Sequence, residues 1–252
     1  TILKTARCLE FKFPETRKKA ADNLKALGIE GLVVIGGDGS FTGARLLSDE
    51  NGINVVGIPG TIDNDLAYTD YTLGFDTAVN TVLWAINNLR DTMTSHDRVS
   101  LVKVMGRRCG DIAMYAGICG GAEYILVPEI PYDIKAIAED IKKSKERGKT
   151  SNIIVLAEGA GNEMEIKTLV SVLSGADVKV TTLGHIQRGG SPTMADRMLA
   201  ARFGTRATEL LLEGKTNRVI GIKHNKIVDL DITEALSETK TINKHMYDMA
   251  AK

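Results

Sequence analysis

The chain carries the stretch Gly31-Leu32-Val33-Val34-Ile35-Gly36-Gly37-Asp38-Gly39-Ser40, which decides its fold. The apolar, β-branched run 33–35 is typical of a strand covered on both faces in a parallel sheet. Three glycines follow it, and we expect them to turn the backbone with positive φ and to leave main-chain N–H groups open to a ligand. The stretch therefore predicts a buried strand that ends at a glycine turn.

Ser40 and Asp38 indicate what this turn binds. Ser40 is a favourable N-cap for a helix over 41–47, so the amino end of that helix and its partial positive charge would face the turn and suit a phosphate. The Asp38 carboxylate would repel a bare phosphate, and a Mg²⁺ held by the carboxylate and by phosphate oxygens resolves the conflict. The turn predicts a metal-bridged polyphosphate, with a plain structural turn as the alternative.

Two common nucleotide motifs do not fit this turn. A Walker A loop needs Gly-Lys-Ser/Thr after its glycines, which is absent here. With Gly37 and Gly39 as the first two glycines of a dinucleotide fingerprint, the third position falls on Thr42. The sequence therefore favours neither a P-loop nor a dinucleotide site.

A second stretch, Pro59-Gly60-Thr61-Ile62-Asp63-Asn64-Asp65, follows a predicted strand over 53–58. In an extended segment Asp63 and Asp65 would point to the same side, roughly 7 Å apart. One carboxylate could then accept a hydroxyl proton while the other holds a metal, although solvated carboxylates in an Asx-rich turn are the common alternative. Two such turns at the carboxyl ends of successive strands lie where open α/β sheets bind ligands.

The composition excludes several function classes. In 252 residues, Lys plus Arg and Asp plus Glu both number 32, so no net charge favours nucleic acid or a membrane surface. No apolar run approaches a membrane span. Cys8, Cys109 and Cys119 fit no Cys-x-x-Cys spacing and indicate a reducing, cytoplasmic compartment.

Strands and helices alternate along the whole chain. This alternation predicts an α/β fold with largely parallel sheets. We expect helices over 15–27, 41–47, from residue 75, 112–118, 135–147, 163–173, 194–212 and the tail, and strands over 31–35, 53–58, 99–104, 124–127, 153–157, 179–183, 218–222 and 226–230.

Polar side chains also follow strand ends or glycine turns elsewhere. Each one alone has an ordinary structural explanation, but together they form a set able to bind a phosphorylated sugar. A guanidinium fork binds phosphate bidentately, a histidine adds a donor and a glutamate accepts from sugar hydroxyls. The residues are Arg98, Arg107, Glu158, His185 and Arg188.

Four motifs in register resemble the 6-phosphofructokinases over nearly the whole chain. They are Gly36-Gly37-Asp38-Gly39-Ser40, Pro59-Gly60-Thr61-Ile62-Asp63-Asn64-Asp65, Met105-Gly106-Arg107 and Gly184-His185-Ile186-Gln187-Arg188-Gly189-Gly190. The resemblance implies two Rossmann-like, three-layer α/β/α domains. The nucleotide and magnesium domain would comprise 1–74 plus 187–237, and the sugar-phosphate domain 75–186 plus 238–252.

The resemblance also implies roles for single residues. Asp63 matches the catalytic base, which takes the proton of the sugar 1-hydroxyl, and Thr61 and Arg107 match residues that position the γ-phosphoryl group. Asp38 matches the Mg²⁺ ligand, with Asp65 as a second residue near the metal. ATP-binding residues would be Gly37, Asp38, Gly39 and Ser40. The fructose 6-phosphate site would comprise Arg98, Met105, Gly106, Glu158, Lys179, His185 and Arg188.

Further implications concern assembly and regulation. Such proteins are homotetramers in which Arg98 and Lys179 come from a neighbouring subunit. Lys179 departs from the usual arginine, keeps its charge and loses the two-pronged contact, so we expect weaker sugar-phosphate binding. A site for an ADP or phosphoenolpyruvate effector would comprise Arg90, Gly121, Glu123, Arg147 and Lys149, although cations are favoured at a helix carboxyl end in any case.

The phosphoryl donor can be predicted separately. In the pyrophosphate-dependent branch, the position of Gly39 is typically Asp and that of Gly60 typically Lys. Both side chains would fill space needed by the α-phosphate of a nucleotide. Glycine at both positions favours ATP, with a pyrophosphate-dependent enzyme as the alternative.

Family members open with a strand and a Gly-Gly-Asp-x-Pro-Gly-x-Asn loop, and they carry an arginine before the segment that resembles residues 1–7. Neither is present here, so we expect the intact protein to be longer and these 252 residues alone to be inactive. A non-catalytic regulatory paralogue is one rival interpretation. Lipid and NAD kinases, which share the Gly-Gly-Asp-Gly turn, are another.

Overall fold

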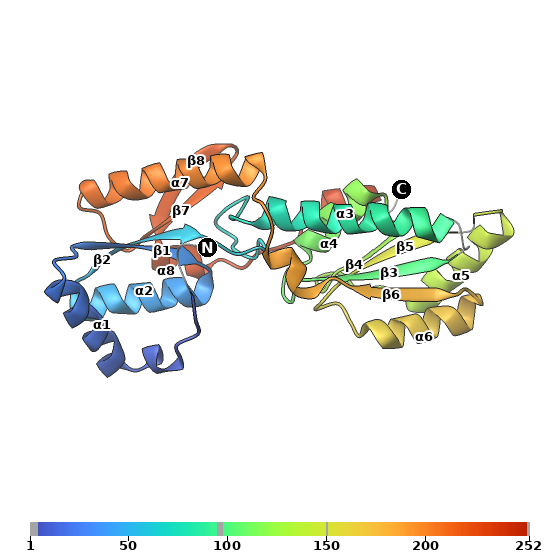
Figure 1. The fold of residues 1–252 in the computed structure, drawn as a ribbon, viewed down its shortest axis with the longest axis horizontal. Helices are drawn as coiled ribbons and strands as arrows, with labels where there is room; N and C mark the ends of the chain where they lie inside the picture. The colour runs from blue at the N-terminus through green and yellow to red at the C-terminus, as the bar shows by residue number, and fades with distance from the viewer. Residues whose placement is uncertain (1–4, 95–97, 150, 251–252) are drawn as a thin grey trace. The chain divides into compact units, whose positions relative to one another are not determined.

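The computed structural model describes residues 5–94, 98–149 and 151–250. The chain forms two compact units. Unit 1 comprises Thr1–Gly60, Leu66–Tyr71 and Met198–Thr239, and unit 2 comprises Thr61–Asp65, Thr72–Arg197 and Lys240–Lys252. Figure 1 draws both.

The sheet of unit 1 has four strands in the order β1-β2-β7-β8. Strand β1 (Gly31–Gly36) pairs in parallel with β2 (Asn54–Pro59), and β2 pairs in parallel with β7 (Arg218–Lys223). Strand β8 (Lys226–Asp231) returns antiparallel to β7 through His224 and Asn225, whose φ angles of 51° and 61° are those of a two-residue hairpin turn.

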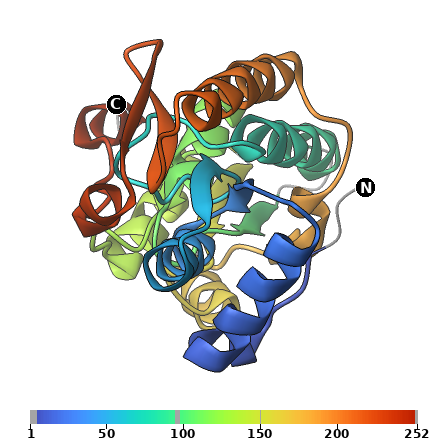
Figure 2. The same cartoon turned by 90° about the vertical axis from the view of Figure 1, so that its left-hand side faces the viewer.

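Helices cover both faces of this first sheet. On one face, α1 (Pro14–Ala26), α2 (Asp38–Asn51) and α8 (Ile232–Ser237) share a core with β2 that includes Phe41 and Val55. Helix α7 (Met194–Leu212) runs along the opposite face, as Figure 2 shows. A short 3₁₀ turn, η1 (Leu9–Lys12), precedes α1.

The prediction that the first strand is covered on both faces is wrong. Leu32 and Val34 pack against the core that contains Phe41. Val33 and Ile35 point to the other face, where they are 37% and 53% exposed. The reason is that β1 lies at the edge of the four-stranded sheet, where successive side chains alternate between a packed and an open face.

The sheet of unit 2 is entirely parallel, in the order β4-β5-β3-β6. Its strands are β3 (Val99–Val104), β4 (Tyr124–Leu126), β5 (Asn152–Ala157) and β6 (Val178–Thr182). Every residue of β5 is buried, as expected for an inner strand with helices on both faces.

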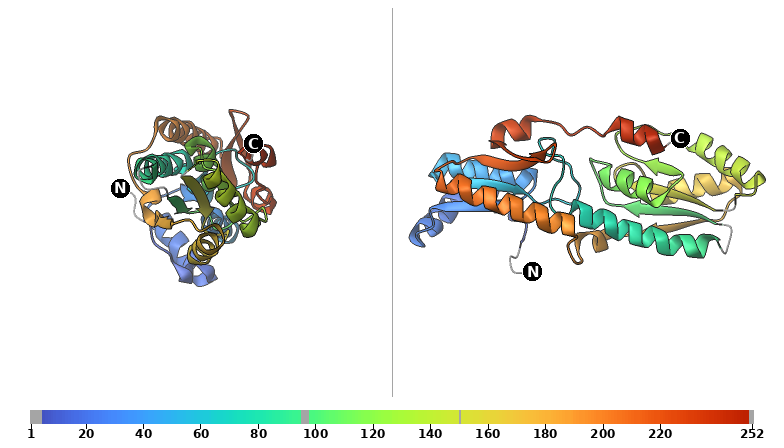
Figure 3. Two further views of the ribbon diagram at one scale, coloured as in Figure 1. Left: turned by 90° about the vertical axis from the view of Figure 1, so that its right-hand side faces the viewer. Right: turned by 90° about the horizontal axis from the view of Figure 1, so that it is seen from above.

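The helices of unit 2 form the outer layers of a three-layer arrangement. Helices α3 (Phe75–Thr94) and α4 (Asp111–Gly120) pack on one face, visible from above in Figure 3, with residues such as Val82, Ile112 and Val155 between the layers. Helices α5 (Ile134–Glu146) and α6 (Glu163–Ser174) pack on the other. A 3₁₀ turn, η2 (Gly184–Arg188), follows β6, and α9 (Lys244–Ala250) ends the described chain.

The α/β class with largely parallel sheets is confirmed, and the elements fall close to the predicted ranges. The strand over 99–104 and the helix over 194–212 have the predicted bounds. The predicted domain division stays a prediction. The compact units differ from it by placing Thr61–Asp65, 72–74 and 187–197 in unit 2 and 238–239 in unit 1. Within the described residues, no helix combines the length and apolarity required to cross a membrane.

Candidate active site

The glycine turn of unit 1 is built differently from the prediction. Helix α2 begins at Asp38 with Gly37 as its N-cap, so Ser40 lies in the first helical turn and is not the cap. Gly37 is extended, with φ −114° and ψ −161°. Gly36 and Gly39 are not among the glycines with positive φ either. The backbone reverses by passing directly from the strand into the helix, which needs no left-handed residue.

Close packing explains the first glycine of the turn. A Cβ on Gly36 would overlap the hydroxyl of Ser40, so only glycine lets α2 start this close to the strand. The N–H of Gly60 donates to the carbonyl of Gly36 over 2.8 Å, which holds the ends of β1 and β2 together. At Gly39 a Cβ would meet no atom within 4 Å, so the space beside this turn is open.

The first turn of α2 can bind an anion. The leading N–H groups of a helix have no partner within the helix and carry a partial positive charge. Asp38 lies in the same turn, and its charge helps to raise the pKa of the Tyr68 phenol, after the larger effect of burial. Across the described residues no group of three or more His, Cys, Asp or Glu side chains could hold a metal. The Asp38 carboxylate is of a type that suits Mg²⁺, which binds through one or two carboxylates and phosphate oxygens.

Unit 2 gathers most of the predicted sugar-site residues at the carboxyl edge of its sheet. Strand β3 leads to Met105, β5 leads to Glu158 and β6 leads to His185. The guanidinium of Arg107 donates to the carboxylate of Glu158 over 3.0 Å. Because parallel strands end at one edge, these loops lie side by side, where open α/β sheets bind ligands.

Gln187, which the sequence analysis did not single out, joins two of these loops. Its side chain is 1% exposed. Its carbonyl oxygen accepts from the N–H of Met105 over 3.1 Å, and its amide donates to the carbonyl of Gly184 over 3.0 Å. Exposed His185 and Arg188 flank buried Gln187, so the turn η2 presents both side chains from a fixed backbone.

The loop with the two aspartates also belongs to unit 2, and it is a turn, not an extended segment. Asn64, between the aspartates, has φ +52°. The Thr61 hydroxyl lies 3.3 Å from the Asp65 carboxylate and 3.3 Å from the N–H of Asp63. The predicted extended conformation of this segment is therefore wrong, because Asn64 between the two aspartates is left-handed.

Asp63 has the environment of a proton acceptor. Burial is the main cause that raises the pKa of its carboxyl, and repulsion from Asp65 adds to it. The positive charges of Arg188 and Arg107 oppose this rise, and Glu158 reinforces it. One carboxylate oxygen of Asp63 is buried without a hydrogen-bond partner in the described structure. The structure thus brings this carboxyl together with the arginines predicted to bind phosphoryl groups.

Arg98 and Lys179 lie elsewhere. Both pair with Asp177, Arg98 through Nε over 3.0 Å and Lys179 through Nζ over 3.0 Å. Arg98 and Asp177 immediately precede β3 and β6, at the amino edge of the sheet. A strand of five or six residues separates the two edges by about 17–20 Å. The ion pairs with Asp177 hold both cations toward the amino edge, away from Glu158 and His185 at the carboxyl edge.

The predicted effector residues fall into three groups by their contacts. The Arg90 guanidinium donates to the carbonyls of Gly120 and Gly121. Glu123 pairs with Lys149 over 2.7 Å and accepts from the N–H of Ile153 over 2.6 Å. Arg147 donates instead to Ser144 over 3.1 Å and lies 3.8 Å from Asp140.

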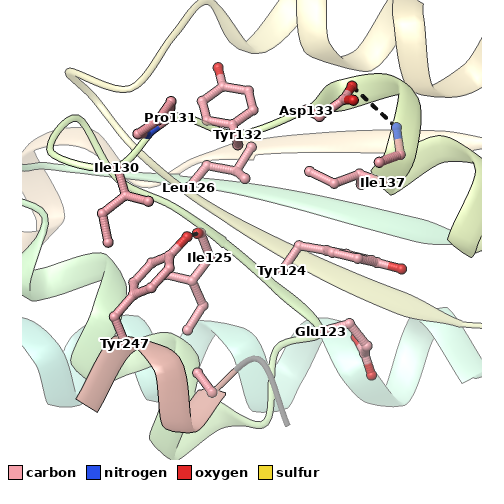
Figure 4. A pocket seen from close by; sticks show the side chains of 12 residues that line it. Glu123, Tyr124, Ile125, Leu126, Ile130, Pro131, Tyr132, Asp133, Ile137 and Tyr247 are labelled. Atoms are coloured by element: carbon pink, nitrogen blue, oxygen red, sulfur yellow. Dashed lines mark hydrogen bonds between the residues drawn. The ribbon is translucent and has the colours of Figure 1, made fainter. Parts of the chain in front are cut away.

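A cavity of about 310 Å³ borders Glu123 between β4, α5 and α9 (Figure 4). Tyr124, Tyr132 and Tyr247 line it together with aliphatic side chains. Each of the three phenols already donates, to Asp140, to the carbonyl of Ala160 and to the carbonyl of Ile125, over 2.6–2.8 Å. These hydroxyls support the walls of the cavity.

Comparison with known proteins agrees with this geometry. The sequence model of the family described as Phosphofructokinase matches residues 1–211. ATP-dependent 6-phosphofructokinase 1 of Clostridium perfringens is 60% identical over 99% of this chain and 78% of its own length, and the ATP-dependent 6-phosphofructokinase of Clostridium acetobutylicum is 59% identical over the same shares. The crystal structure of Pichia pastoris phosphofructokinase in the T-state matches all of this chain and 31% of its own, with a TM-score of 0.87 and 33% identity. The chain belongs to the phosphofructokinase family.

Proposed function

We propose that the protein transfers the γ-phosphoryl group of ATP to the 1-hydroxyl of D-fructose 6-phosphate, the phosphofructokinase step of glycolysis, in the cytoplasm. The observation that carries this proposal is the position of Asp63 in unit 2. Its partly buried carboxyl, with a raised pKa, lies near Arg107 and Arg188 at the sheet edge that bears the sugar-site residues. Family membership and the names of the Clostridium relatives support the same reaction.

The reaction balances with Asp63 as proton acceptor. A bond forms between the sugar 1-oxygen and the γ-phosphorus, while the bond from that phosphorus to the β–γ bridging oxygen breaks and ADP leaves. The hydroxyl proton moves to the Asp63 carboxylate. A loose phosphoryl-transfer transition state does not require early proton removal, so a carboxylate is a sufficient base. Thr61 and Arg107 position the transferred group, and Arg107 offsets its negative charge.

Magnesium fits this assignment. We assign Asp38 of unit 1 as its main ligand, and Asp65 of unit 2 stays a second candidate from the resemblance. When bound, the ion neutralises charge on the triphosphate of ATP. The nucleotide itself is assigned to Gly37, Asp38, Gly39 and Ser40, where the amino end of α2 carries a partial positive charge and Gly39 leaves open space.

The sugar phosphate is assigned to Met105, Gly106, Glu158, His185 and Arg188 of one chain. Arg98 and Lys179 are assigned to the site of a neighbouring copy, because they lie at the opposite edge of the sheet from the rest of the set. This arrangement requires a homo-oligomer, which we propose to be a tetramer. The effector assignment for ADP or phosphoenolpyruvate stays with Arg90, Gly121, Glu123, Arg147 and Lys149.

A coupled assay for ADP release by the full-length natural protein tests the function. With Mg-ATP and fructose 6-phosphate, we expect turnover, and pyrophosphate should not replace ATP. Binding of fructose 6-phosphate without ADP release would identify a regulatory paralogue. Turnover with pyrophosphate alone would identify the other branch, and turnover with only a lipid or NAD as acceptor would remove the protein from this reaction.

A further inference from the structure

Asn64 and Asp111 form a buried contact that joins two loops of unit 2. Asn64 is 1% exposed and Asp111 is 4% exposed. The Asn64 amide donates to the Asp111 carboxylate over 2.8 Å. Asn64 belongs to the turn that carries Asp63 and Asp65. Asp111 is the first residue of α4, directly after the loop that carries Arg107.

The backbone at Asn64 requires support. Its φ of +52° is uncommon for a residue other than glycine. Its side-chain carbonyl lies 3.2 Å from the Thr72 hydroxyl, and that hydroxyl lies 2.6 Å from the carbonyl of Thr61. The backbone carbonyl of Asn64 also accepts from the Cys109 thiol over 3.8 Å. Contacts from three directions therefore fix the residue between the two aspartates.

Asp111 is held in turn by charge. The ammonium of Lys240 lies 3.6 Å from the same carboxylate oxygen that accepts from Asn64. The carboxylate also stands in the first turn of α4, where the helix dipole favours a negative charge. Its other oxygen is buried without a hydrogen-bond partner among the described residues.

We infer that Asn64 and Asp111 are positioning residues, which hold the turn of Asp63 and Asp65 in register with the loop of Arg107. Only the expected effect of these residues on catalysis rests on the proposed function. The contact between Asp111 of α4 and Asn64 of the turn does not depend on that function. Small displacements of reacting groups reduce rates by about 100-fold, so a loosened turn would lower kcat.

The test compares Asn64→Gly with wild type in the full-length protein. Glycine adopts positive φ readily, so the backbone conformation stays accessible while the amide is lost. We expect hydrogen exchange of the amides in residues 61–65 to accelerate at least about 10-fold, and kcat to fall about 10- to 100-fold. The dissociation constant of magnesium-free ADP should change less than kcat, because the residues assigned to the nucleotide itself lie in unit 1.

Two further variants separate positioning from general stability. Asp111→Ala should lose hydrogen-exchange protection in residues 61–65 and lower kcat. Asp111→Asn keeps an oxygen that can accept from Asn64, so it should retain much of both. Ser174→Ala removes another buried hydroxyl, which donates to the carbonyl of Val170 within α6. It should leave exchange in 61–65 and kcat unchanged, even where it lowers the melting temperature.

Each result decides the inference. Wild-type exchange in a folded Asn64→Gly protein would overturn it, as would a fall in kcat with unchanged exchange, which would mean that Asn64 acts on substrate directly. If the wild-type protein transfers no phosphoryl group to fructose 6-phosphate, the proposed function fails. The exchange measurement then decides by itself whether Asn64 and Asp111 hold the turn.

Discussion

Two aspartates have pKa values displaced in opposite directions, and their neighbours explain the difference. At Asp63, burial and the nearby Asp65 raise the pKa, and the arginines only partly oppose them. At Asp229, burial also favours a higher pKa, but hydrogen bonds from Arg206 and Arg218 outweigh it and lower the pKa. Asp63 thus retains the capacity to take a proton, whereas Asp229 is kept ionised as part of the structure.

Asp229 gives a prediction for acid stability. Its folded pKa is below its unfolded value, so it stabilises the fold above the unfolded pKa and loses this effect as pH falls through the folded pKa. We expect Asp229→Asn to lower the free energy of unfolding by roughly 1 kcal/mol near pH 7, after allowance for solvent screening, and by less near pH 2. Melting temperatures of Asp229→Asn and wild type, measured between pH 2 and pH 7, test this prediction.

The control for this prediction is Asp22→Asn. Asp22 forms an exposed pair with Lys18 over 2.9 Å, and such pairs contribute little. It should melt within error of wild type at every pH. An equal loss for Asp229→Asn at pH 7 and pH 2 would show that the arginine contacts do not act through charge.

At the scale of elements, one glycine fixes how two strand-end loops fit together. Gly159 follows β5, and its N–H donates to the carbonyl of Gly106 over 3.0 Å. A Cβ at this position would overlap the carbonyl oxygen of Arg107. Because the overlapping atom is backbone, a side-chain rotation cannot relieve the contact.

Gly159→Ala should therefore displace the loop of Arg107. We expect kcat to fall about 100-fold and the free energy of unfolding to drop by about 1–3 kcal/mol, from a steady-state assay and a urea titration. The matched control is Gly204→Ala in the middle of α7, where a Cβ meets nothing within 4 Å and alanine is the better helix former. If the two variants behave alike, the packing explanation is wrong.

The elements also show what sequence could and could not reveal. Strand ends were predictable, because apolar runs stop at glycines and parallel strands expose their carboxyl ends at one edge. The shape of the loops was not. Gly36 is glycine because α2 approaches it, and Asn64 turns because Asp111, 47 positions away in the chain, accepts from its amide. Contacts between residues so far apart in the chain cannot be predicted from the local spacing of residue types.

At the scale of the whole molecule, the sheet of unit 2 carries candidate site residues at both of its edges. Its carboxyl edge presents Glu158 and His185, while its amino edge presents Arg98 and Lys179 on either side of Asp177. The residue types placed Arg98, Glu158 and His185 in one set, and the resemblance added Lys179 and assigned Arg98 and Lys179 to a neighbour. The parallel register gives that assignment a physical reason, because one chain cannot bring its two strand ends together.

A mixing experiment tests the shared site. Arg98→Ala and Asp63→Asn should each lose most activity at low fructose 6-phosphate. When the two full-length variants are mixed, dissociated and reassembled, some sites combine Arg98 of one chain with Asp63 of another, so part of the activity should return. Recovery absent at every mixing ratio, with assembly verified by native mass, would place the complete site within one chain.

The most direct measurement of the central claim is ³¹P NMR of one turnover by the full-length protein with Mg-ATP and fructose 6-phosphate. The account predicts that a second phosphomonoester appears on carbon 1 as ADP forms, and that Asp63→Asn slows this step by at least about 100-fold while still binding both substrates. Phosphorylation by Asp63→Asn at the wild-type rate, or ADP formed without a new phosphate on the sugar, would contradict it.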